Sequence, residues 1–239
     1  MRAIGVIPAR WGSTRLEGKV LAPIAGKPMI QHVFERAKQS KKLDEVIIAC
    51  DEENILQAAL SFGAVAVLTS KDHPSGSDRI AEAVENKKVD IIVNIQGDEP
   101  LIHPQVIDAL VEALENDVEC RMATVIKAIS GPWELDNPNV VKAVVDENRY
   151  AISFSRSAPV VKDAVVYKHL GIYAYRKDFL LKFRYLPKSV NEKRERLEQL
   201  RALEAGYRIK TVLTDIETVG VDTPEDLNRV REIMDQKIP

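Results

Sequence analysis

The chain has 239 residues, 45% of them hydrophobic, and a formal net charge of −2. A chain of this length can bury a full core, and its near-neutral charge excludes the global basic field that attracts nucleic acids or anionic membranes. Cys50 and Cys120 are too few for a disulfide scaffold, so we expect buried thiols. No apolar run reaches the about 20 residues that span a bilayer, and no signal-peptide pattern opens the chain. We expect a soluble cytoplasmic protein.

The first half of the chain alternates strand and helix patterns. Strands are predicted over residues 2–8, 45–50, 64–69 and 89–96, and helices over 28–40, 52–63, 80–88 and from Pro104. The strands are almost continuously apolar, which is typical of a parallel sheet with helices on both faces.

The second half changes character. Strands are predicted over 122–129, 140–146, 150–156, 169–176 and 209–214, with amphipathic helices over 193–206 and 223–236. The first four of these strands are not separated by long helices, so we expect a smaller antiparallel or mixed extension of the sheet. No Gly/Ser-rich or Pro-rich linker interrupts the chain, and we predict one mixed α/β domain over residues 1–239.

A cationic loop follows the first strand. It contains Arg10, Arg15 and Lys19 among glycines, a combination suited to binding an anion such as phosphate. Neither the Walker A pattern nor G-x-G-x-x-G fits, because Gly12 and Gly18 enclose five residues and Val20 follows Lys19. A solvated basic loop is the alternative interpretation.

Two aspartates also follow apolar stretches. Asp98 lies in QGDEP, after the most apolar strand, and Asp222 lies in GVDTPED. Ligands of open parallel sheets bind at the carboxyl ends of strands, and carboxylates beside phosphate-binding cations favour a hard ion such as Mg²⁺. The alternatives are a turn residue for Asp98 and a helix start for Asp222.

Several motifs together resemble one family. IPARWGSTRLEGKVLAPIAGKPMI, HPSGSDRIAE, VNIQGDEPLI, NPNVVKAV, FSRS, KHLGIYAYR, LEQLRALE and GVDTPEDL are similar, in this order, to motifs of the CMP-Kdo synthetases, the 3-deoxy-manno-octulosonate cytidylyltransferases of bacterial lipopolysaccharide synthesis. The resemblance implies a Rossmann-like nucleotidyltransferase fold and a homodimer. It also implies transfer of CMP from CTP to Kdo, with pyrophosphate released and Mg²⁺ as cofactor.

The resemblance further implies roles for individual residues. Catalysis would involve Arg15, Lys19, Asp98 and Asp222, the two aspartates as metal ligands. The CTP-binding residues would be Arg10, Ser13, Arg15, Lys19, Ser75, Gly76, Arg79 and Gln96. The Kdo-binding residues would be Arg156, His169, Tyr173, Glu198 and Gln199.

Each sugar-site assignment has a structural alternative. His169 could be a satisfied structural histidine, Tyr173 a core residue, and Glu198 a helix-surface residue paired with Arg194 or Arg201. His32, His73 and His103 lie outside the sugar motif and are interpreted as structural or surface residues.

The chain also departs from the family pattern. The family usually has LPGKP where this chain has LEGKV, so Glu17 and Val20 replace two prolines and should leave the loop more flexible. The segment between Ser157 and Lys168 is short and lacks a second arginine, which leaves the binding of the sugar carboxylate open.

Three competing functions remain. A cytidylyltransferase for another acidic sugar, such as neuraminate, is the related alternative, and HLGIYAYR with LEQLR argues against it. An oxidoreductase on a Rossmann-like sheet is disfavoured by the missing G-x-G-x-x-G. A catalytically silent nucleotide-binding module is disfavoured because both metal-type carboxylates are present.

Overall fold

The protein is described here by a computed structural model that covers residues 1–12, 16–159 and 165–236. The chain divides into two compact units, residues 1–108 with 217–239 and residues 109–216, and the division falls inside helix α4 (Pro104–Glu115). Each unit is described by itself, and the prediction of one domain over residues 1–239 stays a prediction. No described helix is long and apolar enough to cross a membrane.

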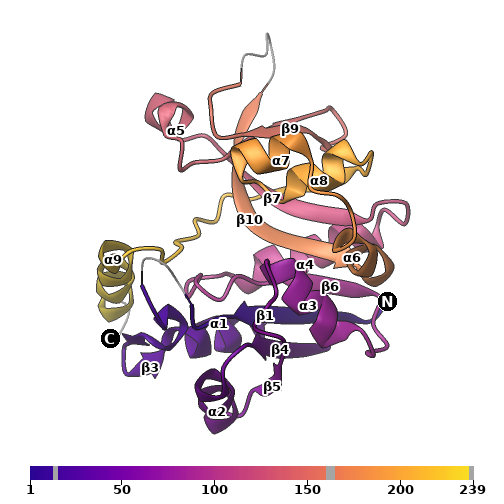
Figure 1. The fold of residues 1–239 in the computed structure, drawn as a ribbon. Coiled ribbons are helices and arrows are strands. Elements are labelled where there is room, and N and C mark those ends of the chain that lie inside the picture. Colours follow the sequence, from indigo (N-terminus) through magenta and orange to yellow (C-terminus); the bar gives the residue numbers. More distant parts are fainter. Residues whose placement is uncertain (13–15, 160–164, 237–239) are drawn as a thin grey trace. The chain divides into compact units, whose positions relative to one another are not determined.

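The first unit contains a parallel sheet in the order β6-β1-β4-β5 (Figure 1). Its strands are β1 (Ala3–Ala9), β4 (Glu45–Cys50), β5 (Val65–Leu68) and β6 (Ile91–Asn94), and every neighbouring pair is parallel. The four predicted strands are confirmed to within three residues at each end. β1 and β6 are almost wholly buried, as their apolar sequences require.

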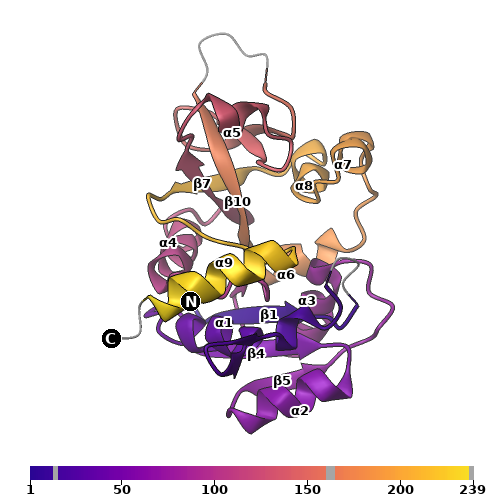
Figure 2. The same ribbon diagram turned by 90° about the vertical axis from the view of Figure 1, so that its left-hand side faces the viewer.

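The helices that pack against this sheet are α1 (Met29–Ala37), α2 (Glu53–Ser61) and α3 (Gly76–Val84). The C-terminal helix α9 (Pro224–Asp235) packs instead against the short strand β2 (Pro23–Ile24). α1 and α3 contact β1 and β4, and α2 contacts β4 and β5. Figure 2 shows α9 alongside α1, where Leu227 and Val230 join Met29 and Ile24 in one apolar cluster.

Two details of this unit differ from the prediction. A 3-10 turn η1 (Lys19–Leu21) and a small hairpin of β2 (Pro23–Ile24) and β3 (Lys27–Pro28) separate the cationic loop from α1. Helix α3 begins at Gly76, inside the predicted loop, because Ser75 caps it: the Ser75 hydroxyl accepts a hydrogen bond from the Asp78 backbone N–H.

The second unit is built around the long strand β10 (Val166–Arg176). β10 is antiparallel to β7 (Met122–Ala128) and β8 (Lys142–Val145), β8 is antiparallel to β9 (Ala151–Ser155), and β11 (Ile209–Leu213) is parallel to β7. Short helices complete it: α5 (Pro132–Asp136), α6 (Lys177–Phe183), α7 (Val190–Glu195) and α8 (Gln199–Glu204). The predicted mixed sheet with a smaller antiparallel extension is confirmed.

The single helix predicted over 193–206 is wrong. Two short helices replace it, because Arg196 adopts a left-handed conformation with φ of 56° that ends α7. A buried ion pair joins the two pieces, with Arg201 Nη2 2.6 Å from Glu192 Oε1 and side-chain exposures of 5% and 8%. Tertiary packing therefore overrides the amphipathic pattern.

Strand β10 carries a bulge. Its register against β7 shifts between Leu170, opposite Val125, and Tyr173, opposite Thr124. Gly171 and Ile172 are therefore extra residues, and the strand bends where the HLGIY motif lies.

The ends of β1 and β6 approach closely at Gly97. A Cβ added there would lie 2.8 Å from the backbone oxygen of Pro8, closer than real contacts allow. We predict that Gly97→Ala lowers the free energy of unfolding by about 1–3 kcal/mol, because two backbones must move apart. Urea denaturation measures this, with Gly220→Ala as control since nothing lies within 4 Å of its added Cβ. Equal stabilities of the two variants would show that the approach is not constrained.

Candidate active site

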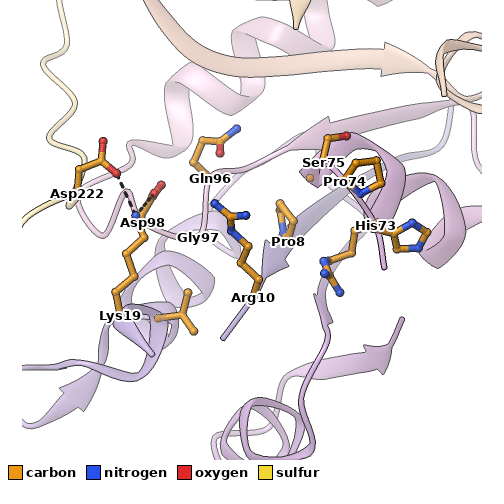
Figure 3. Close-up of a pocket in the computed structure, with 13 residues that line it drawn as sticks. Pro8, Arg10, Lys19, His73, Pro74, Ser75, Gln96, Gly97, Asp98 and Asp222 are labelled. Carbon is orange, nitrogen blue, oxygen red and sulfur yellow. Dashed lines mark hydrogen bonds and ion pairs between the residues drawn. The ribbon is translucent and has the colours of Figure 1, made fainter. Parts of the chain in front are cut away.

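A cavity of about 340 Å³ opens at the carboxyl ends of the parallel strands of the first unit. Figure 3 shows Lys19, Asp98 and Asp222 at one end, Arg10 and Gln96 in the middle, and His73, Pro74 and Ser75 at the other. The structure thus brings together residues from four segments that are distant in the sequence, namely the cationic loop, HPSGSDR, QGDEP and GVDTPED. Crevices of this kind are the usual ligand sites of open parallel sheets.

The Lys19 ammonium lies between two carboxylates. Its Nζ is 2.6 Å from Asp98 Oδ2, 3.1 Å from Asp222 Oδ1 and 2.9 Å from the backbone oxygen of Val221. Three acceptors use the three donors of an ammonium group. Lys19, predicted to bind triphosphate, is therefore held by the two predicted metal ligands (Figure 3).

Backbone pairing places Asp222 beside Asp98. The Val221 backbone N–H donates to the backbone oxygen of Asp98 at 2.8 Å. The Val221 side chain is fully buried in the cluster with Ile24 and Met29. The cap of α9 is Thr223, which forms a capping box with Asp226. Asp222 is thus not the cap, and its carboxylate is directed to Lys19.

Glu99 follows Asp98 in the QGDEP motif. Its Oε2 is buried and has no hydrogen-bond partner in the described part of the chain. Burial and the neighbouring Asp98 carboxylate raise the pKa of Glu99 to about 8. Glu99 is therefore mostly neutral at pH 7 when no cation is bound beside it.

The cationic loop is closed by Trp11 and Gly18. Gly18 N–H donates to the Trp11 oxygen at 3.0 Å, and the indole of Trp11 packs where a Cβ on Gly18 would lie, 2.9 Å away. The indole Nε1 donates to Glu17 Oε1 at 3.0 Å, and Val20 is buried. Both residues that replace family prolines thus have structural partners. Arg10 is exposed and forms no ion pair within the described residues, while Ser13 and Arg15 lie outside them.

Arg79 is buried in an ion pair. Its Nη2 lies 3.2 Å from Asp51 Oδ2, its Nη1 donates to the Thr69 hydroxyl at 2.6 Å, and it is 4% exposed. Asp51 Oδ1 also accepts the Trp11 backbone N–H at 2.9 Å. Arg79 lines the cavity, but its charge is satisfied by Asp51, so the geometry favours a supporting role over direct contact with an anion.

The other predicted nucleotide residues lie where α3 and β6 meet the cavity. Ser75 caps α3 and Gly76 begins it, and both line the cavity together with Pro8 and Pro74. Gln96 lines its middle, with Nε2 3.5 Å from Asn94 Oδ1.

A second polar cluster lies in the second unit. His169 is buried, with Nε2 2.8 Å from the Thr124 hydroxyl and its ring edge-on to Phe154 at 4.9 Å between centroids. Burial alone lowers the pKa of His169 to about 3, so the imidazole is neutral at pH 7.

Tyr173 and Gln199 extend this cluster. The rings of His169 and Tyr173 are 5.6 Å apart, although residues four apart on a regular strand are separated by about 13 Å. The bulge in β10 accounts for this contact. The Tyr173 hydroxyl donates to Gln199 Oε1 at 3.1 Å, and the buried Gln199 Nε2 has no hydrogen-bond partner among the described residues.

The remaining predicted sugar residues are held by the protein itself. Arg156 donates from Nε to the backbone oxygen of Glu195 at 2.8 Å and from Nη1 to the backbone oxygen of Pro138 at 3.1 Å. Glu198 Oε1 lies 3.9 Å from Arg201 Nη2, as one alternative interpretation predicts. The structure therefore joins His169, Tyr173 and Gln199 directly, while Arg156 serves as a link between backbone segments.

The donor set of the first cavity fits a hard cation. Asp98 and Asp222 both direct an oxygen to one position, where the Lys19 ammonium lies, and carboxylate oxygens are ligands that Mg²⁺ prefers. Within the described residues, no group of three His, Cys, Asp or Glu side chains could hold a metal ion. Two protein ligands suit Mg²⁺, which usually retains waters and binds substrate phosphates.

Comparisons with known proteins agree with this geometry. A family model described as cytidylyltransferase matches residues 4–211. A 3-deoxy-manno-octulosonate cytidylyltransferase of Solibacter usitatus (strain Ellin6076) is 51% identical, over 99% of this chain and 96% of that one. The chain belongs to the 3-deoxy-manno-octulosonate cytidylyltransferase family. Another member, from Syntrophobacter fumaroxidans (strain DSM 10017 / MPOB), is 49% identical over 99% and 98% of the two chains.

Solved structures give the same family and fold. One of CMP:2-keto-3-deoxy-manno-octonic acid synthetase complexed with CTP matches with a TM-score of 0.95 and 44% identity over 100% of both chains. A 4-diphosphocytidyl-2C-methyl-D-erythritol synthase from Anaerococcus prevotii DSM 20548, 12% identical with a TM-score of 0.67 over 98% of both chains, shares the fold alone. The Rossmann-like nucleotidyltransferase fold is confirmed.

Three residues that line the cavity or contact the candidate site residues were not among the predicted site residues. Asp51 follows β4 as Asp98 follows β6, so the strand-end rule could have found it. His73 lines the first cavity and pairs with Glu82, although it was interpreted as structural or surface. Thr124 lies inside an apolar strand and gives no signal in the sequence.

The buried neutral His169 predicts a pH dependence of stability. The unfolded chain has the ordinary histidine pKa of about 6.5, so between pH 6.5 and 3 the unfolded state binds more protons and stability falls as pH falls. We predict that wild type loses up to roughly 3 kcal/mol more than His169→Gln between pH 7 and pH 4. Urea denaturation at both pH values measures this, with His103→Gln as control. Equal losses of unfolding free energy in wild type and His169→Gln would show that His169 becomes a charged imidazolium in the folded protein.

Proposed function

We propose that the protein transfers CMP from CTP to 3-deoxy-D-manno-octulosonate, giving CMP-Kdo and pyrophosphate for lipopolysaccharide biosynthesis. The observation that carries the proposal is one cavity in which cations for a triphosphate, Arg10 and Lys19, stand beside two convergent carboxylates, Asp98 and Asp222. Family membership identifies the nucleotide and sugar that suit such a site.

The reaction needs mainly positioning and charge stabilisation. The oxygen of the sugar's anomeric hydroxyl attacks the α-phosphorus of CTP and forms a new P–O bond, and the hydroxyl proton passes to solvent. The bond between the α-phosphorus and pyrophosphate breaks, so pyrophosphate leaves. We assign Arg10, Lys19 and, by family motif, Ser13 and Arg15 to the triphosphate, where positive charge stabilises the leaving group. Ser75, Gly76 and Gln96 are assigned to the nucleoside, and Arg79 supports this pocket through Asp51.

We assign Asp98 and Asp222 as ligands of Mg²⁺. The bound ion would supply Lewis acidity that lowers the pKa of the attacking hydroxyl. Because Lys19 Nζ contacts both carboxylates, a metal bound there competes with the ammonium. Lys19 released from the aspartates is then available to the triphosphate, which reconciles its observed contacts with its assigned role.

The sugar is assigned to the cluster of His169, Tyr173 and Gln199. Neutral hydrogen-bonding groups suit hydroxyls, and the buried unpartnered amide nitrogen of Gln199 supports a ligand there, because such an orphaned donor is costly. Arg156 and Glu198 remain family-based candidates for the same substrate, Arg156 for its carboxylate.

We also propose that the enzyme is a cytoplasmic homodimer. Both cysteines are free and buried, which suits a reducing compartment. The homodimer is carried over from the family resemblance.

A substrate panel tests the proposed function. Purified protein is incubated with CTP, Mg²⁺ and either Kdo or N-acetylneuraminate while pyrophosphate is followed. We expect release with Kdo and background with neuraminate. Binding of CTP with no pyrophosphate release in the presence of Kdo would contradict the proposal. Faster pyrophosphate release with N-acetylneuraminate than with Kdo would show that the acidic sugar substrate is neuraminate.

The carboxylate assignment generates a second prediction. Asp98→Asn and Asp222→Asn are nearly isosteric, so the fold should remain while turnover falls about 10- to 100-fold, equivalent to a charge-assisted contact of about 1.5–3 kcal/mol. Asp178→Asn, which removes a carboxylate from a surface ion pair with Arg121, serves as control. Turnover is measured against Mg²⁺ concentration, with thermal unfolding in parallel. Turnover at the wild-type level in Asp222→Asn would show that Asp222 is not a ligand of the metal.

A further inference from the structure

The hydroxyl of Thr124 has three polar neighbours. Its Oγ1 lies 2.8 Å from His169 Nε2, 2.9 Å from the backbone oxygen of Ile172 and 3.4 Å from that of Leu170. Thr124 is fully buried and His169 is 8% exposed, so water does not replace these contacts.

Counting protons fixes the direction of the hydrogen bonds. A hydroxyl has one proton, and a backbone carbonyl can only accept. When Thr124 donates to the Ile172 oxygen, its lone pairs face His169, and Nε2 must carry a proton to complete the pair. The reverse arrangement would point the Thr124 lone pairs at two carbonyl oxygens, which is unfavourable.

The bulge in β10 supplies the deciding carbonyls. Gly171 and Ile172 are extra residues opposite β7, and the Ile172 carbonyl accepts a hydrogen bond from the Thr124 hydroxyl at the bulge. The HLGIY motif therefore provides both the histidine and the backbone acceptor that determines which nitrogen of the imidazole carries the proton.

We propose that Thr124 is a positioning residue that holds His169 in the neutral tautomer protonated at Nε2, so that Nδ1 accepts a hydrogen bond from a hydroxyl of the sugar. The role of the sugar rests on the proposed function. Gln199, linked to His169 through Tyr173, offers a donor from its unpartnered Nε2. The cluster thus presents one acceptor and one donor, which suits a polyol.

Nuclear magnetic resonance of the ligand-free protein tests the tautomer. The four histidines are labelled with ¹⁵N, and the His169 signals are assigned by their loss in His169→Gln. We expect a pyrrole-type shift for Nε2 and a pyridine-type shift for Nδ1 at pH 7. A pyridine-type Nε2 in the wild type would overturn the proposal without any variant.

Two variants of Thr124 test its role. Thr124→Val keeps the shape and removes the acceptor, so we expect a mixture of His169 tautomers and a KM for Kdo raised about tenfold, the size of one lost hydrogen bond. Thr124→Ser keeps the hydroxyl and should restore both values, and the KM for CTP should stay unchanged in both variants.

The outcomes separate this inference from the proposed function. An unchanged tautomer in Thr124→Val would overturn the role of Thr124. A changed tautomer with an unchanged KM for Kdo would overturn the contact between His169 and the sugar. Absence of pyrophosphate release by the wild type with Kdo would contradict the proposed function, while the wild-type ¹⁵N shifts would still decide the tautomer.

Discussion

One ammonium group connects three distant segments of the first unit. Lys19 Nζ contacts Asp98 after β6 and Val221 and Asp222 before α9, which lie 79 and more than 200 positions away. The contact exists because Val221 is buried and its N–H pairs with the Asp98 backbone. The α9 cap, the apolar cluster under it and the end of β6 therefore all determine where the two carboxylates lie. Repulsion between them is offset by the ammonium, since opposite charges at this distance and partial exposure attract by a few kcal/mol at most.

The two polar clusters differ in their physics. The cavity of the first unit is open and charged, with an exposed Arg10 and an Asp222 side chain that is 64% exposed. The cluster of the second unit is buried and neutral, and burial keeps the His169 imidazole in its uncharged form. Exposed cationic side chains suit a multiply charged phosphate, because they replace the water that solvates it. Neutral buried groups suit the hydroxyls of a sugar, which need only directional hydrogen bonds. The residues assigned to the nucleotide and to the sugar follow this division.

The sequence predicts the elements whose cause is local. The apolar strands β1, β4 and β6 and the helix predicted over 223–236 appear in the structure as expected, because strand burial patterns and helix starts depend on adjacent residues. The position of Asp98 at the cavity follows from the strand-end rule, whereas Asp222 follows no strand and is placed by the pairing of the Val221 N–H with the Asp98 backbone oxygen. What the sequence could not show depends on long-range contacts. The break at Arg196 accompanies the Arg201–Glu192 pair, the satisfied charge of Arg79 depends on Asp51, and the contact of Thr124 with His169 depends on the bulge.

The central claim is that Asp98 and Asp222 form one cation site for which Lys19 and a metal compete. Magnesium affinity measured by calorimetry without nucleotide tests it most directly, comparing wild type with Lys19→Met. Removing the ammonium relieves like-charge repulsion, so Mg²⁺ should bind Lys19→Met about tenfold more tightly. Equal or weaker binding in Lys19→Met would contradict the account, because the two carboxylates would then not share a cation position with Lys19.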